Sequence, residues 1–423
     1  MTGAPAQAGY GELLRHNPAV RWLWIGSVVS LFGDWFNTMA VFALVERLTG
    51  SPLALGLVLA TKLLGFAAFG LPGGLLADRL SRKALMIGSD LARALVVLAF
   101  LLVDAPGDVP LLIALLALQV GLGAVFDPAF RAALPTLTTP RELLTANALL
   151  AATWSALLAL GAAIGGFATA ELGVDAVFAI DAATYLVSAY CVSRVALPAQ
   201  PRQSDRPTGI FSAARADLVL GWHYVRARPP VARLALSKAA WAVGGGGLVY
   251  FLTQLGPLLA PADGALGVGL LFSARGVGTG LGPILARRYF TDRRRWPALI
   301  GACVATSGVA YALLPGLGWT FAVIVPIVVA HAASGANWVL STVLLQERVD
   351  NALLGRVFGA EMMILMLVEA ASTVAAAALL ELGALSLASG LILFALVQTA
   401  CGVLFMVLVP RAERREAAAA PQG

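Results

Sequence analysis

The sequence has little charge. Only 12% of its 423 residues are Asp, Glu, Lys or Arg, against about 25% in an ordinary soluble domain, whereas 59% are apolar. A soluble chain of this length would need more surface charge to stay dispersed, so lipid is the expected solvent for most of it. The net charge of +6 lies in short clusters rather than on one long face, which argues against nucleic-acid binding.

Cysteine is also scarce. The three cysteines, Cys191, Cys303 and Cys401, all fall in apolar runs and form neither a metal-binding spacing nor a disulfide framework. The sequence contains no nucleophile–base–acid set, no His/Glu metal spacing and no phosphate-binding loop. It therefore predicts no metal, no cofactor and no enzymatic activity.

Long apolar stretches make up most of the chain. Twelve are long enough to cross a hydrocarbon layer of about 30 Å, so we predict an all-α membrane protein with twelve transmembrane helices. The stretches run at about 22–46, 52–77, 84–103, 109–127, 145–170, 174–196, 231–260, 264–286, 297–315, 318–345, 353–380 and 384–409. The run Gly244–Gly247 marks 231–260 as a candidate for a broken or hinged helix.

Basic residues are concentrated in alternate loops. One set of loops contains Arg and Lys, for example at 79–83, 202–228 and 287–295. The opposite loops contain Arg47 and otherwise acids, among them Asp104 and Glu381. Because basic loops stay on the cytoplasmic side, we predict a multi-pass protein of the bacterial plasma membrane with both termini in the cytoplasm.

A polar stretch divides the chain into two halves. The predicted parts are an N-terminal six-helix bundle (1–196), a cytoplasmic linker (197–230), a C-terminal six-helix bundle (231–410) and a cytoplasmic tail (411–423).

The linker contains a predicted amphipathic helix from Phe211 to Arg226. Phe211, Leu218, Trp222 and Val225 share one face of this helix. Such a face is typical of a helix lying in the membrane interface, and a solvated linker helix is the alternative.

The two halves contain matching loops. Gly74–Lys83 follows the second span and Gly282–Arg288 follows the eighth, while 134–142 and 345–352 join spans four to five and ten to eleven. Parallel repeats of six spans are typical of alternating-access transporters. We therefore predict two pseudo-symmetric six-helix bundles.

The loop after the second span has the pattern Gly74-x-x-x-Asp78-Arg79-x-x-Arg82-Lys83. This pattern resembles the loop 2–3 signature of the major facilitator superfamily, and the resemblance extends over nearly the whole chain. Further segments are similar to the enterobactin-exporter-like and macrolide-efflux-like branch, namely Gly33-Asp34, Leu48–Ser51, Asp127–Ala129, Leu143–Leu149 and Gly355–Gly359.

The resemblance implies a secondary transporter that exports a small amphipathic molecule, such as a drug, a macrolide or a siderophore-like compound, by proton antiport. Multidrug resistance and siderophore export are the roles that this implies. The expected partners are the substrate, protons and the lipid bilayer, and we expect a monomer. An uptake permease or a lipid-type flippase of the same fold is the alternative, followed by a non-transporting receptor.

Two positions depart from the drug/proton antiporter pattern. The segment Gly161–Gly166 is similar to the antiporter Gly-Pro-x-x-Gly-Gly signature, with Ala162 in place of the proline. The fourth span lacks the intramembrane arginine of many such antiporters, since Ala117 occupies the nearest position. Both departures concern the antiport mechanism rather than the fold.

In the resembled fold, the loop after span two forms a conformational latch. Gly74 would let span eleven approach, and Asp78 would bind the positive end of that helix together with neighbouring basic residues. We therefore expect a latch for the outward-open state at Gly74, Asp78, Arg79, Arg82, Lys83 and Arg131. A pure topology signal is the alternative.

Asp34 is the clearest intramembrane charge. An ionisable residue inside a span costs about 2.5–3.5 kcal/mol by insertion scales, so it usually has a function. Asp34 shares a polar stripe of helical spacing with Ser27, Ser30, Asn37 and Thr38, which should face a water-filled cavity. Because withdrawal from water favours a protonated carboxyl, Asp34 is the predicted proton-coupling residue, and a static acid beside a base is the alternative.

Four further ionisable residues within the spans are functional candidates. Lys62 and Glu369 belong to spans two and eleven, which adjoin in the resembled fold, so we expect a buried structural or gating pair; Glu369 is also a proton-coupling candidate. Arg275 would pair with an acid or meet an anionic substrate. His331 is a second proton-carrier candidate because imidazole titrates near neutral pH, with a hydrogen-bonded packing histidine as the alternative.

Aromatic and amide side chains within the spans are candidates for the substrate cavity. Together they suit a bulky amphipathic substrate better than a sugar, although any single Trp can equally face lipid. The candidates are Asn37, Gln119, Trp154, Trp241, Tyr250, Asn337 and Trp338.

Overall fold

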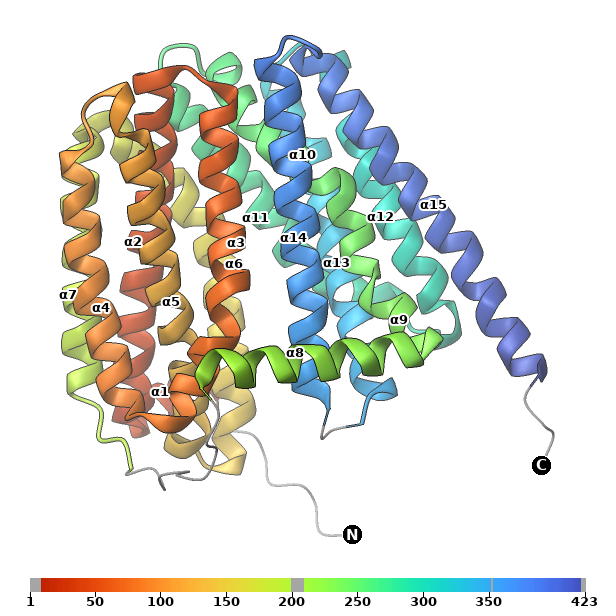
Figure 1. Ribbon diagram of the computed structural model, residues 1–423, viewed down its shortest axis with the longest axis horizontal. Helices are drawn as coiled ribbons and strands as arrows, with labels where there is room; N and C mark the ends of the chain where they lie inside the picture. The colour runs from red at the N-terminus through yellow and green to blue at the C-terminus, as the bar shows by residue number, and fades with distance from the viewer. Residues whose placement is uncertain (1–8, 199–208, 351–352, 420–423) are drawn as a thin grey trace. The chain divides into compact units, whose positions relative to one another are not determined.

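The computed structural model of the protein describes residues 9–198, 209–350 and 353–419, and its regular structure is helical throughout this part (Figure 1). Twelve helices are long and apolar enough to cross a membrane. The predicted all-α class with twelve spans is therefore confirmed.

The chain forms two compact units, of which the first comprises residues 1–49 and 65–214. It contains a short N-terminal helix, which is predicted to lie in the cytoplasm, and the first six spans. They are α1 (Tyr10–His16), α2 (Pro18–Thr49), α3 (Pro52–Arg79), α4 (Arg82–Ala99), α5 (Val109–Leu137), α6 (Pro140–Leu172) and α7 (Val174–Ser193), with 3₁₀ turns η1 (Phe100–Leu102) and η2 (Pro106–Asp108).

The second unit comprises residues 50–64 and 215–423. It contains the linker helix and the last six spans. These are α8 (Ile210–Ala227), α9 (Pro229–Ala235), α10 (Ser237–Leu259), α11 (Gly264–Tyr289), α12 (Trp296–Ala312), α13 (Ile324–Arg348), α14 (Leu354–Glu381) and α15 (Leu387–Ala419), with turns η3 (Arg293–Arg295), η4 (Leu314–Leu317) and η5 (Phe321–Val323).

The two units repeat the same helix packing. In the first, α2 packs against α6 and α7, and α4 packs against α5 and α7. In the second, α10 packs against α14 and α15, and α12 packs against α13 and α15. The pairs correspond span for span, so the repeat inferred from the loops is also a repeat of tertiary structure.

The first part of α3 packs within the second unit. A Cβ at Gly56 would overlap Ala377 of α14, and Glu381 at the end of α14 accepts hydrogen bonds from Ser51 Oγ at 2.9 Å and Leu53 N at 3.1 Å. Residues 50–64 thus belong structurally with the last six spans, although their sequence position is in the first half.

The seventh span is broken, but not at its glycine run. The chain turns at Leu236, between α9 and α10, and Gly244–Gly247 lie in continuous helix. A Cβ at Gly246 would overlap the backbone oxygen of Glu369, and one at Gly247 would overlap the ring of Phe394. The glycines therefore allow α10 to pack closely between α14 and α15.

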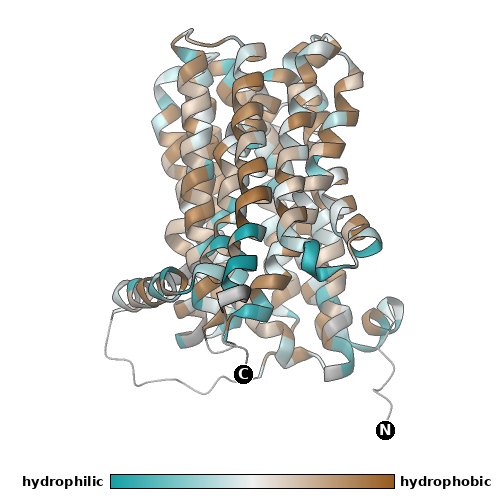
Figure 2. Ribbon diagram, turned by 90° about the vertical axis from the view of Figure 1, so that its right-hand side faces the viewer, coloured by the Kyte–Doolittle hydropathy of each residue, from teal (hydrophilic) through white to brown (hydrophobic). Residues whose placement is uncertain are grey.

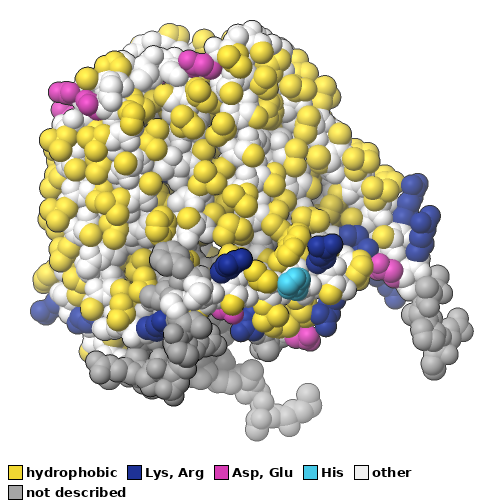
Figure 3. All heavy atoms as spheres, in the orientation of Figure 1, with side chains coloured by type: hydrophobic (Ala, Val, Ile, Leu, Met, Phe, Trp, Pro, Cys, Tyr) yellow, Lys and Arg dark blue, Asp and Glu magenta, His cyan; other side chains and the backbone are white. Residues whose placement is uncertain are grey.

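The surface is apolar along the spans and polar at their ends. Figure 2 shows hydrophobic residues along the length of the helices, with hydrophilic residues concentrated near one end. On the face drawn in Figure 3, Lys and Arg side chains gather over α8 and at the end of α15. This distribution is what a membrane-spanning chain with basic loops requires.

The linker helix α8 docks by one side. Tyr224 and Val225 are buried in a hydrophobic cluster of the second unit, and Asp217 forms a 2.8 Å ion pair with Arg356 of α14. Trp222 is exposed whereas Val225 is buried. The two residues therefore have different environments, although the sequence predicts that they share one face of the helix. The side chain of Phe211 lies outside the described residues.

Candidate functional site

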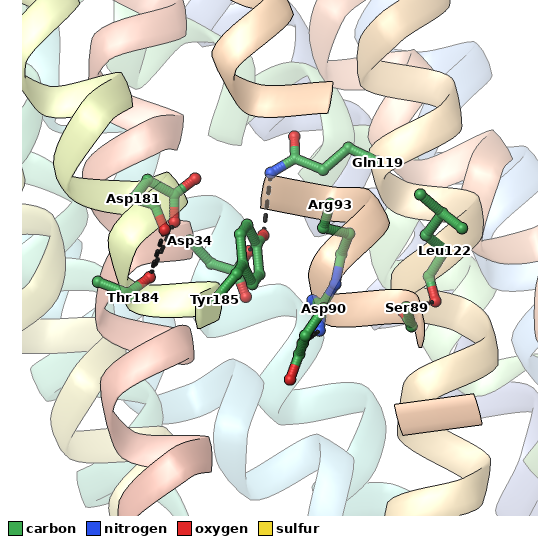
Figure 4. A network of polar contacts seen from close by, with 9 residues as sticks. All are labelled: Asp34, Ser89, Asp90, Arg93, Gln119, Leu122, Asp181, Thr184 and Tyr185. Carbon is green, nitrogen blue, oxygen red and sulfur yellow. Dashed lines mark hydrogen bonds and ion pairs between the residues drawn. The ribbon is translucent and has the colours of Figure 1, made fainter. Parts of the chain in front are cut away.

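Four helices of the first unit contribute a polar network near the middle of their length (Figure 4). α2 provides Asp34, α4 provides Asp90 and Arg93, α5 provides Gln119, and α7 provides Asp181, Thr184 and Tyr185. Such a concentration of ionisable groups inside apolar helices is costly, which makes this network the candidate functional site.

Asp34 is half-buried and belongs to a chain of hydrogen bonds. The Tyr185 hydroxyl donates to Asp34 Oδ1 and accepts from Gln119 Nε2 at 3.0 Å. Tyr185 is completely buried, so its hydroxyl needs both partners. The network therefore fixes one oxygen of the Asp34 carboxyl and leaves the side chain partly accessible.

Arg93 neutralises one acid of the network. Its guanidinium forms a buried ion pair with Asp90, one turn earlier on α4. It also lies over the rings of Tyr185, at 4.3 Å, and Phe126, at 4.9 Å. The carboxylate and the two aromatic faces hold this guanidinium in place, so Arg93 is a fixed positive charge at the centre of the site.

Asp181 is a completely buried acid of the network. It has 0% exposure, and its carboxyl interacts electrostatically with Asp34 and Arg93. Thr184 Oγ1 lies 3.3 Å from Asp181 Oδ1. Three carboxyls and one guanidinium thus share the site within this unit.

The sequence predictions identified this site in part. Asp34, Asn37 and Gln119 were candidates, and Gln119 does join Asp34 through Tyr185. Asp90, Arg93 and Asp181 were missed, although they lie in predicted spans. The rule that selected Asp34, an ionisable residue inside an apolar helix, would have selected them too. Arg93 supplies from the third span the intramembrane arginine that the fourth span lacks.

The second unit contains a separate buried ion pair that the sequence predictions also missed. Lys238 Nζ of α10 lies 3.0 Å from Glu361 Oε1 of α14, with 3% and 0% of the two side chains exposed. Lys238 also donates to Thr342 Oγ1 at 3.0 Å and lies over the ring of Trp338 at 4.5 Å. The pair therefore links α10, α13 and α14.

Arg275 and His331 belong to a second group in this unit. Tyr311 Oη and His331 Nε2 are hydrogen-bonded at 2.8 Å, and Arg275 interacts electrostatically with both of them and with Glu369. His331 has the geometry of a hydrogen-bonded packing residue. The roles of His331 and Glu369 as proton carriers stay predictions. The pairing of Lys62 with Glu369 stays a prediction as well.

The basic residues of the predicted latch have partners within the first unit. Arg82 Nη1 donates to the carbonyl of Ala132 at 2.8 Å, and Lys83 Nζ donates to that of Ser193 at 2.6 Å. Arg131 pairs with Asp127 at 2.7 Å. The side chain of Asp78 lies outside the described residues. The role of Arg79 in the latch, and the latch as a whole, stay predictions.

Gly74 differs from its neighbour Gly73 in its surroundings. Among the described residues, a Cβ at Gly74 would meet nothing within 4 Å, whereas one at Gly73 would overlap the carbonyl of Ala124 on α5. The close helix approach in this structure therefore depends on Gly73.

The proposed cavity residues have contrasting environments. Trp154 and Trp338 are exposed, whereas Asn37, Trp241, Tyr250 and Asn337 are buried. The amide of Asn37, the indole nitrogen of Trp241 and Oδ1 of Asn337 have no hydrogen-bond partner in the part of the chain that the structure describes. Tyr250 instead donates to the carbonyl of Pro52 at 2.9 Å.

Twelve spans in two repeated bundles, with ionisable groups at the centre of the first, define a membrane transporter of the alternating-access type. Residues 23–373 match the family model described as Major Facilitator Superfamily. The chain belongs to this family, whose members are secondary transporters and not enzymes.

Two curated relatives carry names of exporters. The "Putative bacilysin exporter BacE" of Bacillus subtilis (strain 168) is 25% identical over 344 residues, covering 81% of this chain and 83% of that protein. Macrolide efflux protein A of Streptococcus pyogenes is 26% identical over 178 residues, covering 42% of this chain and 44% of that protein.

A solved structure supports the fold independently. The crystal structure of the POT family transporter PepTSo covers 95% of this chain and 99% of its own, with a TM-score of 0.72 and 12% identity. At this identity the likeness extends to the fold alone.

Proposed function

We propose that this protein exports a small amphipathic molecule across the bacterial plasma membrane by proton antiport, and that Asp34 gains and loses the coupled proton. The observation behind this proposal is the half-buried Asp34 carboxyl within a buried polar network of one bundle. A carboxyl in that position is partly accessible and is hydrogen-bonded into the network, so it is placed to exchange a proton with water.

Arg93 gives the network a physical basis for coupling. A fixed guanidinium, held by Asp90, stabilises the ionised form of nearby acids. Once Asp34 binds a proton, its attraction to Arg93 weakens. The electrostatic interactions that hold α2, α4 and α7 in one arrangement are then weaker as well. Protonation would thereby bias the equilibrium between conformations of the bundle.

The export direction and the substrate class rest on different support. Two relatives are named as exporters, one of bacilysin and one of macrolides. In addition, Asn37 in one unit and Trp241 and Asn337 in the other are buried with unpaired polar atoms among the described residues. Buried amide and indole groups beside apolar surface suit an amphipathic ligand.

Efflux in cells is the first test. We would express the protein in a bacterial host lacking its major pumps and measure accumulation of the macrolide erythromycin and of a panel of antibiotics and siderophores. We expect reduced accumulation of at least one compound, and a protonophore should abolish the reduction. The Asp34→Asn variant should lose the efflux, whereas Asp175→Asn, an exposed acid at the end of α7, should keep it.

Reconstituted protein separates the alternatives. In proteoliposomes with an imposed pH gradient, antiport requires substrate and protons to move in opposite directions. Movement in the same direction would identify uptake by symport, and flux without proton movement would identify an uncoupled permease or flippase. Unchanged efflux by Asp34→Asn would remove Asp34 from the mechanism.

A further inference from the structure

Asp181 of α7 has no part in the mechanism above, yet it is completely buried and, unlike Asp90, forms no ion pair among the described residues. Figure 4 shows it on the side of the network next to Thr184 and Asp34. A buried ionised carboxyl normally has a countercharge or several donors, so its partners decide which form it takes.

The hydrogen bonds around Asp181 are too few for a carboxylate. The Thr184 hydroxyl can donate one hydrogen bond. Its oxygen lies 2.7 Å from the backbone oxygen of Asp181 and 3.3 Å from Oδ1, so it donates to the backbone oxygen. Oδ2 has no partner in the described part of the chain. Asn37 of α2, which is 1% exposed, lies within interaction range of this carboxyl, but neither polar atom of its amide forms a hydrogen bond of standard geometry. A protonated carboxyl could donate to the amide oxygen.

The charges around Asp181 do not compensate it either. From α2 it faces Asp34, a like charge, and from α4 it faces Arg93, which is already paired with Asp90. Tyr185 is the neighbouring titratable group on α7 itself. η1 contains no ionisable side chain, and those of α6 stand only at its ends. Two neighbouring carboxyls beside one shared cation rarely ionise together.

The helix packing makes room for this carboxyl. A Cβ at Gly33 of α2 would overlap both Thr184 Oγ1 and Asp181 Oδ1. Because Gly33 has no side chain, Asp181 can lie against the backbone of α2 at this point. Gly33 is the residue that precedes Asp34 in the sequence. The position of Asp181 is thus a property of the α2–α7 contact and not of a flexible side chain.

We propose that Asp181 is a second proton-binding group of this site and exchanges its proton with solvent through Asp34. In the transfer, the O–H bond of the Asp181 carboxyl breaks and an O–H bond forms on the Asp34 carboxylate, so one proton moves and no electrons are exchanged. The charge on either carboxyl then affects proton binding by the other. The role of this pair in transport rests on the proposed antiport, whereas proton binding itself does not.

A proton fits the site better than a metal ion. Among the described residues, no group of three or more His, Cys, Asp or Glu side chains is placed to hold a metal. A monovalent cation such as sodium would need several oxygen ligands, whereas a proton needs only the carboxyl oxygen itself, and Asp181 Oδ2 has no hydrogen-bond partner among the described residues. The test nevertheless includes sodium.

Infrared difference spectroscopy on the full-length protein in lipid tests the proposal without a substrate. Spectra taken across a pH titration report protonated carboxyls by their C=O bands. Among the bands of buried carboxyls in the wild type, we expect one to be lost in Asp34→Asn and a different one to be lost in Asp181→Asn. Asp175→Asn, an exposed acid on the same helix, should retain both. Exchange of choline for sodium should leave the bands unchanged.

A second variant keeps the proposal testable if Asp181→Asn does not fold. Thr184→Val removes the neighbouring hydroxyl with little change of volume and should shift the Asp181 band alone. A spectrum unaltered by both variants, or bands displaced by sodium, would overturn the proposal. If both bands are found but proteoliposomes show no proton movement, the antiport function fails and the second proton site stands. If antiport is intact but the Asp181 band is absent, only the second site fails.

Discussion

At the scale of single residues, the decisive question is which buried charges have partners. Lys238 and Glu361 satisfy each other, and Thr342 and Trp338 complete the surroundings of the ammonium group. Glu361 depends on this pair more than Lys238 does, because neither of its oxygens has another hydrogen-bond partner among the described residues. The pair is therefore expected to be structural.

Removing one member of this pair should be more harmful than removing both. Glu361→Gln leaves the Lys238 ammonium buried without a countercharge, and we expect a loss of about 3–5 kcal/mol of unfolding free energy. Thermal unfolding of the detergent-solubilised protein measures the effect as a lower Tm. The double variant Lys238→Met/Glu361→Leu should recover most of the loss, since apolar groups of similar volume need no partner.

The exposed pair Arg233–Glu416 supplies the control. Its atoms lie 2.6 Å apart, but the Glu416 side chain is 44% exposed. Glu416→Gln should therefore leave Tm almost unchanged. Equal losses of stability for Glu361→Gln and Glu416→Gln would show that burial does not set the strength of the first pair.

At the scale of helices, glycine positions decide how closely two spans approach. Gly246 and Gly247 allow α10 to pack against α14 and α15, and Gly33 allows α2 to pack against α7. The glycine run was expected to mark a hinge, but the seventh span breaks at Leu236 instead. Packing with neighbouring helices, which the run itself does not reveal, keeps this segment in a regular helix.

The adjacent residues Gly73 and Gly74 provide a matched pair of variants on α3. Gly73→Ala places a methyl group against the carbonyl of Ala124, and overpacking of this kind costs about 1–3 kcal/mol. Gly74→Ala meets open space among the described residues and should leave Tm unchanged. Tm of the purified variants tests both expectations.

Efflux by the Gly74→Ala variant tests the predicted latch. If Gly74 lets another helix approach in a different conformation, Gly74→Ala should slow efflux without a loss of stability. Normal efflux by Gly74→Ala would reduce this loop to a topology signal.

At the scale of the whole molecule, two properties are combined: a repeated six-helix packing and a one-sided distribution of basic residues. The packing pairs of α2 and α4 recur for α10 and α12. Among the described residues, the charge network with Asp34 has no counterpart at the corresponding helices of the second unit, where Lys238 pairs with Glu361 and Arg275 interacts with Glu369. The repeat is therefore one of architecture, and the two units have diverged in their chemistry.

The orientation of the chain can be tested with reporters. Because Arg and Lys are concentrated in alternate loops, the positive-inside rule places both ends in the cytoplasm. Green fluorescent protein fused after Gly423 should fluoresce, and alkaline phosphatase fused there should be inactive. Alkaline phosphatase inserted at Pro106, in a predicted outer loop, should be active. The reverse pattern would invert the proposed direction of transport.

The sequence alone determined the twelve spans, the helical class and the six-plus-six repeat, because span length and apolar content are local properties of the chain. It also identified Asp34, and it contained the same signal for Asp90, Arg93 and Asp181, which lie in equally apolar spans. The tertiary structure alone decided that Tyr185 connects Asp34 to Gln119, that Asp181 faces Asp34, and that Lys238 meets Glu361. These contacts depend on the rotation and the neighbours of each helix, and residues far apart in sequence set both.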